Sequence, residues 1–545
     1  MPQAGCFCSA PFHPIMLRIL MLGLLFAQWA QGQTLQTRPE RTRYTETSRY
    51  EDVMTFLRKL PQSPMLHQTN MGYSMEGREL PLLVWGKVRN ASPEAVKASG
   101  KLRFFVMANI HAGEVEGKEA MLALLRELAQ GKHKAWADSV VVLIAPIYNA
   151  DGNERIRLTN RPLQNGPIRG MGQRPNAQDL DLNRDHMKVK SPEARGLMAL
   201  LNAYDPHVWM DLHTTDGSVH GYHLTYAPPL HPNTNPEMDH FLREVWLPDV
   251  TRAVKSEKDW DIFHYGNLPE TGPGYSNADQ QTVRGWYSYD HRPRFSTNYA
   301  GLRNMFGILS EAYSYATFQE RIEVSKVFVQ DCIRFAWKHA RTIQRLKAQA
   351  DAEVLIGESL AVRATLTQDA TPKTILLGEV SEITQPYTGE TMWQMKPEKH
   401  PEVMPVFLTF TPTEKTTVPA AYIIAPERTN MRKLLETHGI QIWKLPQEQT
   451  LEVEQFQVDT TWTSKNAFQG AKERTVKGHY VTSVQKMPAE SVVVSMRQPL
   501  ARLIFSLLEP RSDDGVVTWN YLDEVLEKRQ PFPIFRVKIE PKEAP

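Results

Sequence analysis

Short apolar runs alternate with helical stretches between residues 102 and 352, and this alternation limits the folds that the chain can adopt. The runs of strand length lie at 102–108, 140–145, 207–212 and 306–309. Helical spacing and capping residues predict helices at 118–130, 191–202 and 317–352. Strands that are apolar on consecutive positions are buried on both faces, so the pattern predicts an α/β fold, a parallel or mixed sheet flanked by helices.

The composition and the strand pattern of the sequence change after about residue 353. Segments such as 406–410 and 491–494 are short and β-rich, and Pro and Thr become frequent. A chain of 545 residues is long enough for two or more domains. We therefore expect a smaller, mostly β domain over 355–545, with a short helix near 430–439.

The N-terminus has the pattern of a signal peptide. A basic start at Arg18 precedes an apolar stretch at 19–26, and Ala30-Gln31-Gly32 places small residues at an exit site. The apolar stretch is shorter than the about 20 residues that cross a bilayer. The pattern predicts a signal peptide over 1–32, with an upstream extension at 1–15, and a secreted or periplasmic protein. The alternative is an N-terminal membrane anchor.

Charge and cysteine content exclude several classes of site. Lys and Arg (63) nearly balance Asp and Glu (61), so no strong field favours nucleic acid or an anionic membrane. Cleavage of the signal peptide would remove Cys6 and Cys8 and leave Cys332 alone. We therefore expect no nucleic-acid partner, no stable membrane insertion after cleavage, and no disulfide within one mature chain.

Three of the expected strands end in polar residues that can bind metal or move protons. His111 and Glu114 follow the first strand, and His213 and Glu311 lie at the ends of two others. Sites in open α/β sheets form at the carboxyl ends of strands. Imidazole and carboxylate are both good Zn²⁺ ligands, so the three strand ends together predict a metal site.

Two further segments complete the pattern. One is the turn Asn149-Ala150-Asp151-Gly152, and the other is Asp181-Leu182-Asn183-Arg184. The planar guanidinium of Arg184 suits a carboxylate ligand, and Asn183 adds a neutral donor. An Asn-Arg pair near a metal site is therefore typical of carboxylate recognition.

These five segments, in this order, resemble the zinc carboxypeptidase family, the metallocarboxypeptidases of the carboxypeptidase A type (peptidase family M14). The resemblance covers roughly residues 45–345 and implies a catalytic domain over 45–350. It also implies a mixed sheet of about eight strands flanked by helices. The β-rich domain over 355–545 falls outside it and has no role that the sequence assigns.

The resemblance implies a role for each matching residue. The metal ligands would be His111, Glu114 and His213, holding one Zn²⁺ per chain. Glu311 would be the general base, and Asp181 would orient His111. Asn183 and Arg184 would hold the terminal carboxylate of the substrate.

The chain departs from the family's pattern at several positions. Counting to the arginine that stabilises the oxyanion reaches Gln164, and among the arginines nearby we expect Arg161 to take this role. For the substrate-binding tyrosine upstream of the general base we expect Tyr299, with Tyr289 as the alternative. The residue that selects the substrate's side chain cannot be assigned from the sequence.

A second group of histidines competes with the predicted metal site. His220, His223 and His231 follow His213 closely, and the first two have a spacing that permits a shared metal. They lie in a segment rich in Gly, Pro and Tyr, which favours pocket-lining or surface positions.

The sequence therefore predicts a secreted zinc metallocarboxypeptidase that hydrolyses the C-terminal peptide bonds of peptides or proteins. One alternative is a zinc enzyme that hydrolyses a different bond, an amidase or deacylase that acts on cell-wall peptides or acylated amino acids. The other alternative is a non-catalytic peptide-binding module. The oligomeric state is left open.

Overall fold

The computed structural model of the chain describes Met1 and residues 35–215, 217–269 and 283–541. Apart from Met1, the predicted signal peptide lies outside these residues. One compact unit extends from Thr37 onward. In the described part of the chain, each helix is too short or too polar to cross a bilayer.

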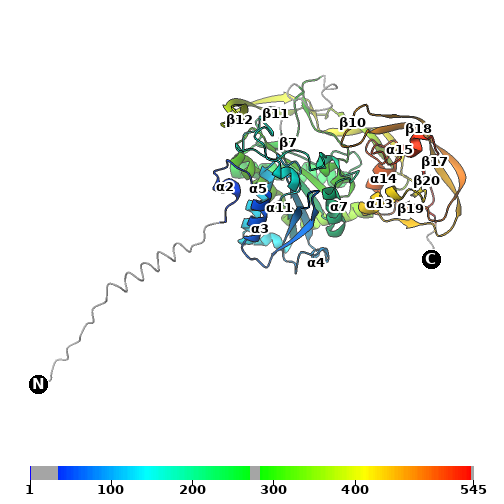
Figure 1. Ribbon diagram of the computed structural model, residues 1–545, viewed down its shortest axis with the longest axis horizontal. Coiled ribbons are helices and arrows are strands. Elements are labelled where there is room, and N and C mark those ends of the chain that lie inside the picture. Colours follow the sequence, from blue (N-terminus) through cyan, green and yellow to red (C-terminus); the bar gives the residue numbers. More distant parts are fainter. Residues whose placement is uncertain (2–34, 216, 270–282, 542–545) are drawn as a thin grey trace. The chain divides into compact units, whose positions relative to one another are not determined.

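A mixed sheet of eight strands forms the centre of this unit, in the order β1-β2-β4-β3-β5-β9-β6-β7. Figure 1 shows the chain coloured along its sequence. The strands are β1 (Leu66–Tyr73), β2 (Glu79–Trp85), β3 (Leu102–Ala108), β4 (Val140–Ala145), β5 (Val208–Thr215), β6 (Leu224–Ala227), β7 (Ile262–His264) and β9 (Phe306–Tyr313). The fold class expected from the sequence, a mixed eight-stranded sheet flanked by helices, is confirmed.

The middle of the sheet is parallel and buried. β3 pairs in parallel with β4 and β5, and β5 pairs in parallel with β9. Every residue of β4 and β5 is buried, which explains their continuous apolar sequences. The antiparallel hairpin of β1 and β2 extends one edge. Most residues of β1 are polar and at least partly exposed, so its sequence has no clear strand pattern.

Helices on this region cover the sheet. They are α2 (Arg38–Arg41), α3 (Tyr50–Arg58), α4 (Pro93–Ala98), α5 (Glu116–Ala129), α6 (Ala150–Glu154), α7 (Pro192–Tyr204), α8 (Pro236–His240), α9 (Leu247–Lys258), α10 (Ser296–Leu302), α11 (Phe318–Lys338) and α12 (Ala340–Ala352). α5 and α9 both pack against α11. The single helical stretch expected at 317–352 is divided at His339 into α11 and α12.

The C-terminal region is rich in strands, as expected. A six-stranded sheet has the order β16-β19-β15-β20-β17-β18, and β11 pairs with β12 as β10 pairs with β14. The strands are β10 (Ser359–Thr367), β11 (Lys373–Thr384), β12 (Thr391–Met404), β13 (Val406–Phe407), β14 (Thr409–Thr417), β15 (Ala421–Ile424), β16 (Trp443–Lys444), β17 (Gln449–Thr463), β18 (Arg474–Met487), β19 (Val492–Ser495) and β20 (Ile534–Val537). The helices are α13 (Thr429–Thr437), α14 (Ala501–Leu508) and α15 (Asp523–Glu527).

The C-terminal region contacts the eight-stranded region at several points. β13 pairs in parallel with β8 (Trp286–Tyr287) of the preceding region. The buried Arg294 donates from its backbone N and its Nε to Asp514, at 2.6 and 2.9 Å. The two regions therefore share buried polar contacts, and the division into two domains near residue 353 remains a prediction.

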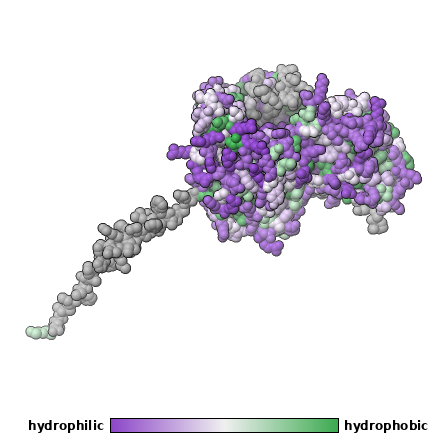
Figure 2. Space-filling view, viewed as in Figure 1, coloured by the Kyte–Doolittle hydropathy of each residue, from purple (hydrophilic) through white to green (hydrophobic). Residues whose placement is uncertain are grey.

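The apolar residues gather in the interior and leave a polar surface. Figure 2 shows a face of the molecule that is mostly hydrophilic, with hydrophobic residues scattered over it. This distribution is the ordinary result of burying apolar side chains in the cores of the sheets.

Asp331 on α11 makes the stability of the fold depend on pH. Burial raises the pKa of Asp331 from 3.8 to about 7, against the opposing charge of Arg334. The folded state therefore binds a proton that the unfolded chain has released, and its stability falls as pH rises from 3.8 toward 7.

We expect Asp331→Asn to remove this loss. Thermal melting should give a higher Tm than the parent protein at pH 8, and the difference should shrink toward pH 4. Asp459→Asn on β17 is the control because the Asp459 side chain is 60% exposed. An equal gain at both pH values would contradict the account.

Candidate metal centre

Three parallel strands end at the same edge of the sheet, and the candidate site lies at that edge. β5 lies between β3 and β9, and His213 on β5 is opposite Glu311 on β9. His111 and Glu114 follow β3, in the turn that leads into α5. Strand pairing therefore brings together side chains that are far apart in the sequence, as the strand-end pattern predicted.

The turn after β3 is held from two sides. Asn109 adopts a positive φ of 65°, and its side chain donates to the carbonyl of Glu114 at 3.2 Å. Asn149 donates from its side chain to the carbonyl of Ile110, also at 3.2 Å. Gly117 lets α5 approach β5 closely, because a Cβ at this position would lie 2.7 Å from the Cβ of Leu212. The Asn149–Gly152 segment thus supports the turn that carries His111 and Glu114.

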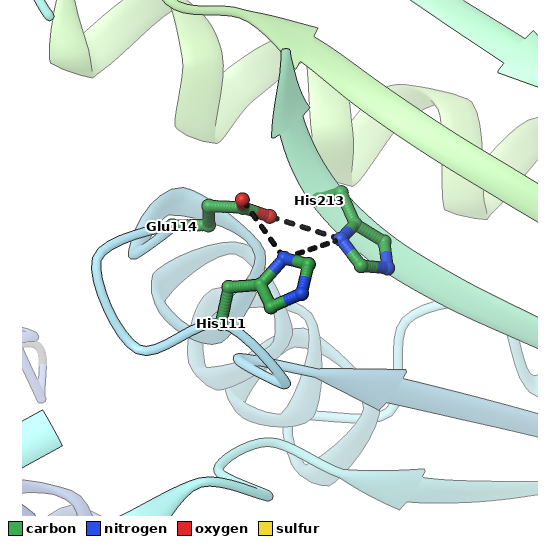
Figure 3. Close-up of side chains that lie close together, drawn as sticks. All are labelled: His111, Glu114 and His213. Carbon is green, nitrogen blue, oxygen red and sulfur yellow. Dashed lines mark hydrogen bonds and ion pairs between the residues drawn. The ribbon is translucent and has the colours of Figure 1, made fainter. Parts of the chain in front are cut away.

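His111, Glu114 and His213 converge on one point, where one potential ligand atom of each lies within 4.8 Å of the others. Figure 3 shows the two imidazoles facing the carboxylate. His111 Nδ1 lies 2.9 Å from Glu114 Oε1, and His213 Nδ1 lies 2.9 Å from Glu114 Oε2. The two Nδ1 atoms are 3.2 Å apart, and all three side chains are buried.

A further carboxylate contacts the Nε2 atom of each imidazole. His111 Nε2 lies 3.0 Å from Asp181 Oδ1, and His213 Nε2 lies 2.8 Å from Asp211 Oδ2. The hydroxyl of Ser296 also donates to Asp211 Oδ2, at 2.6 Å. With Nε2 as the donor to a carboxylate, each ring presents the lone pair of Nδ1 toward Glu114. The sequence analysis assigned Asp181 this position but overlooked Asp211, two residues before His213.

The charges of the site favour a cation at the point of convergence. Burial by itself raises the pKa of Glu114, but nearby His111 and Arg161 hold that pKa well below its usual range. Burial lowers the pKa of His213, while Asp211 and Glu114 raise it well above its ordinary value. The carboxylates are therefore ionised, and the site binds positive charge, either a proton or a metal ion.

The donor set fits zinc. Two imidazole nitrogens and one carboxylate form the protein ligands of a known class of catalytic zinc site, which keeps a further position open. Carboxylates that orient the ligating histidines are typical of such sites. In the described part of the chain, these three residues alone form a group of three or more His, Cys, Asp or Glu with metal-binding geometry.

The three residues line a cavity of about 700 Å³. Glu311 and Arg184 line the same cavity. The other residues that line the cavity belong to the eight-stranded region and to the C-terminal region. They are Arg174, Asp181, Asn183, Thr214, Thr215, Tyr265, Ser288, Tyr289, Asp290, Arg292, Arg294, Phe295, Thr297, Leu309, Phe468, Gln469 and Glu473. The predicted base and the predicted carboxylate-binding arginine thus open onto the same space as the metal ligands.

The Asn183-Arg184 segment is fixed by its surroundings. Asn183 Oδ1 accepts from the backbone N–H of Ser296 at 2.8 Å. The guanidinium carbon of Arg184 lies 3.8 Å from the centre of the Phe295 ring. Burial lowers the pKa of Arg184 to about 10, against the charge of Asp181. Arg184 is therefore still a cation at neutral pH, and it is held in place for a bound anion.

Arg174 lines the cavity close to the metal ligands, and the sequence analysis did not select it. Its Nε donates to Asp181 Oδ2 at 2.9 Å, and its Nη1 lies 3.7 Å from Glu114 Oε1. The Arg174 side chain is 43% exposed. Arg161 instead forms an ion pair with Glu114 and does not line the cavity, and Gln164 is buried.

Tyr299, which we expected to bind substrate, does not line the cavity. Tyr299 is fully buried on α10, and its hydroxyl lies 2.6 Å from His438 Nδ1 and within hydrogen-bond distance of Met198. Its side chain points toward the C-terminal region, whose contribution counting along the sequence did not reveal. Tyr289, the alternative, lines the cavity, and its hydroxyl lies 2.5 Å from Thr297 Oγ1.

The competing histidines do not converge. The His220 ring packs against Tyr313 with centroids 4.0 Å apart, and burial lowers the pKa of His220 to about 3. His223 packs against Trp260. His231 lies beside His291, with ring centroids 5.8 Å apart. These contacts are typical of buried packing residues.

Comparison with known proteins points in the same direction as the site. Residues 53–247 match the zinc carboxypeptidase family, which confirms the resemblance noted in the sequence. Carboxypeptidase 2 of Trichophyton equinum is 24% identical over 518 residues, covering 90% of this chain and 87% of that protein. Carboxypeptidase 2 of Trichophyton rubrum is 24% identical over 519 residues, with the same shares covered.

Solved structures with a similar fold include a metallo-carboxypeptidase from Burkholderia cenocepacia, with a TM-score of 0.40 and 17% identity over 55% of this chain and 71% of that one. Carboxypeptidase A from Helicoverpa armigera has a TM-score of 0.39 and 15% identity, over 62% of this chain and 81% of that one.

The metal site predicts a clear difference between two histidine variants. His213→Ala removes one of the convergent donors, so the purified protein should lose stoichiometric zinc. His220→Ala is the matched control, because its buried ring packs on Tyr313 and belongs to no group of three potential ligands among the described residues. Metal analysis by mass spectrometry should find one zinc per chain in the control. If the control loses zinc and His213→Ala retains it, the metal is not bound by His111, Glu114 and His213.

Proposed function

We propose that this protein, a zinc-dependent metallocarboxypeptidase by the domain at residues 53–247, removes C-terminal residues from peptides and proteins outside the cytoplasm. One observation carries the proposal. The convergent His111, Glu114 and His213 share a single cavity with an acid, Glu311, and a fixed cation, Arg184. Such a cavity combines a metal site, a proton acceptor and an anion-binding group.

His111, Glu114 and His213 would hold one zinc ion per chain. In such a site zinc acidifies water and polarises a carbonyl group. Asp181 and Asp211 keep each imidazole in the tautomer whose Nδ1 carries the lone pair. The ligand positions are set before a metal arrives, because hydrogen bonds hold both rings and the carboxylate.

Glu311 acts as the general base in this proposal. It lies opposite His213 in the strand register and lines the cavity. From this position its carboxylate takes a proton from the attacking water and later delivers that proton to the leaving amine. The strand pairing of β5 and β9 fixes the distance between the base and the ligands.

Asn183 and Arg184 bind the terminal carboxylate of the substrate. The guanidinium of Arg184 is held against Phe295, so little conformational entropy is lost when it binds an anion. This contact requires a free C-terminus and thereby places the last peptide bond at the metal. Tyr289 and Leu309 lie deeper in the same cavity, where the side chain of the last residue is bound.

Arg174 is the group that stabilises negative charge on the carbonyl oxygen. It opens onto the cavity beside Glu114, and its hydrogen bond to Asp181 holds it there. A fixed cation at this point stabilises the charge that develops in the transition state. Arg161, which pairs with Glu114, supports the ligand carboxylate instead.

Export follows from the predicted signal peptide at 1–32, and it places the enzyme where peptide substrates of external origin occur. The substrates proposed are peptides and the C-termini of proteins. The charge balance of the chain gives no reason to expect nucleic acid as a partner.

Matched peptides with free and amidated C-termini test the function. We expect release of the last residue from the free peptide and a drop in kcat/KM of about 100-fold or more for the amide, because Arg184 loses its charged partner. Mass spectrometry of the products identifies the bond that is cut. Equal cleavage of both peptides, or cleavage of acyl groups alone, would favour an amidase or deacylase.

Glu311→Gln separates metal binding from chemistry. The substitution preserves shape and removes the proton acceptor, so kcat should fall by about 100- to 10,000-fold. Zinc content should stay at one per chain, because Glu311 is not among the three converging residues. A variant with near-parental kcat would exclude Glu311 as the base.

The two arginines near Glu114 should differ in their effects. Arg174→Ala should lower kcat by about 100- to 1,000-fold at saturating zinc, because it removes charge stabilisation in the transition state. Arg161→Ala should instead weaken zinc binding, measured by competition with a chelator, with kcat nearly restored by added zinc. If Arg161→Ala lowers kcat and Arg174→Ala instead weakens zinc binding, Arg161 is the residue that stabilises the oxyanion.

A further inference from the structure

The loop between β17 and β18, residues 464–473, brings the C-terminal region to the cavity. Phe468, Gln469 and Glu473 of this loop line the same space as the metal ligands. The loop lies outside residues 53–247, which match the zinc carboxypeptidase family. It is therefore a part of the site that the family match does not describe.

The loop has a defined conformation. Phe468 and Ala471 exchange backbone hydrogen bonds at 2.7 and 3.0 Å, and Gln469 and Gly470 between them both have positive φ, 51° and 74°. Two positive φ angles in a two-residue turn are those of a tight hairpin turn, for which Gly is favoured. The turn presents Phe468 and Gln469 from a fixed backbone.

Two contacts attach the loop to residues that line the cavity. Gln469 Oε1 accepts from the backbone N–H of Asp181 at 2.6 Å, beside the carboxylate that contacts His111. Glu473 forms an ion pair with Arg294. The guanidinium carbon of Arg294 also lies 5.5 Å from the centre of the Phe468 ring. The loop is thus held at Gln469 and at Glu473, and Arg294 lies near the Phe468 ring.

Exposure differs strongly among the residues that line the cavity. Leu309 is 4% and Tyr289 7% exposed, so both lie in its buried part, the deep end, together with the metal ligands at 3%. Phe468 is 39% exposed, so it lies at the outer end. A peptide whose last residue enters the deep end must pass the outer end with the residues that precede the cut. Phe468 is the apolar side chain that meets them there.

We propose that this loop, which for this purpose we name the Phe468 loop, is a substrate-recognition element: Phe468 binds an apolar or aromatic side chain on the amino side of the scissile bond. This inference rests on the proposed carboxypeptidase function and adds a specificity determinant to it. Of the loop residues that line the cavity, Glu473 is paired with Arg294 and the other two are uncharged, so this part of the loop offers the substrate an aromatic surface. Oligopeptides with an apolar residue before the last one are the substrate class that this surface selects.

Two peptides that differ only in the penultimate residue, Phe or Gly, test the proposal on the full-length zinc enzyme. The parent protein should cleave the Phe peptide with a kcat/KM about tenfold higher, since an aromatic pair contributes an effect of this order. In Phe468→Ala this preference should fall to about one, while kcat/KM for the Gly peptide stays unchanged.

Trp462→Ala is the matched control. Trp462 is an aromatic residue on β17 of the same hairpin, is 47% exposed, and does not line the cavity. It should leave the Phe-over-Gly preference intact. A parent protein with no preference, or a Phe468→Ala variant that loses activity on both peptides equally, would overturn the proposal. Failure to cleave either peptide would count against the carboxypeptidase function itself.

Discussion

The hydrogen bonds from the outer nitrogens of two histidines to carboxylates determine the geometry of the site. Asp181 and Asp211 hold the rings of His111 and His213 so that both Nδ1 atoms point toward Glu114. These contacts depend in turn on the parallel pairing of β5 with β3 and β9, which aligns the strand ends. A buried group of two imidazoles and one carboxylate is costly unless a cation completes it. The arrangement therefore makes most physical sense as a metal site.

Local patterns made part of this structure predictable. Buried parallel strands are apolar on consecutive positions, so β3, β4, β5 and β9 could be recognised, and the site residues at their ends followed. Contacts between residues that lie far apart in the sequence could not be found in this way. Tyr299 was misplaced because its partner, His438, comes from the C-terminal region. Arg174 was overlooked because orientation, rather than spacing, distinguishes it from Arg161. The hairpin of β1 and β2 was missed because β1 is a polar edge strand.

The C-terminal region takes part in building the site. Asp514 binds Arg294, which lines the cavity, and Gln469 binds the backbone next to the carboxylate that orients His111. On another part of the eight-stranded region, the backbone N–H of Trp393 in β12 donates to the carbonyl of Leu163 at 3.0 Å. The family match at residues 53–247 covers the metal ligands, whereas these contacts come from the C-terminal region, which lies outside that match. The outer part of the cavity is the place where such a region alters substrate choice.

X-ray absorption at the zinc edge tests the central claim most directly, because it reports the atoms around the metal without reference to activity. The account predicts a first shell of nitrogen and oxygen at about 2.0–2.2 Å, with the outer-shell scattering of two imidazoles. His213→Ala protein should retain little zinc, and the zinc that it binds after reconstitution should show half of that imidazole signal. A sulfur shell at about 2.3 Å, or an imidazole signal unchanged by the substitution, would contradict the account.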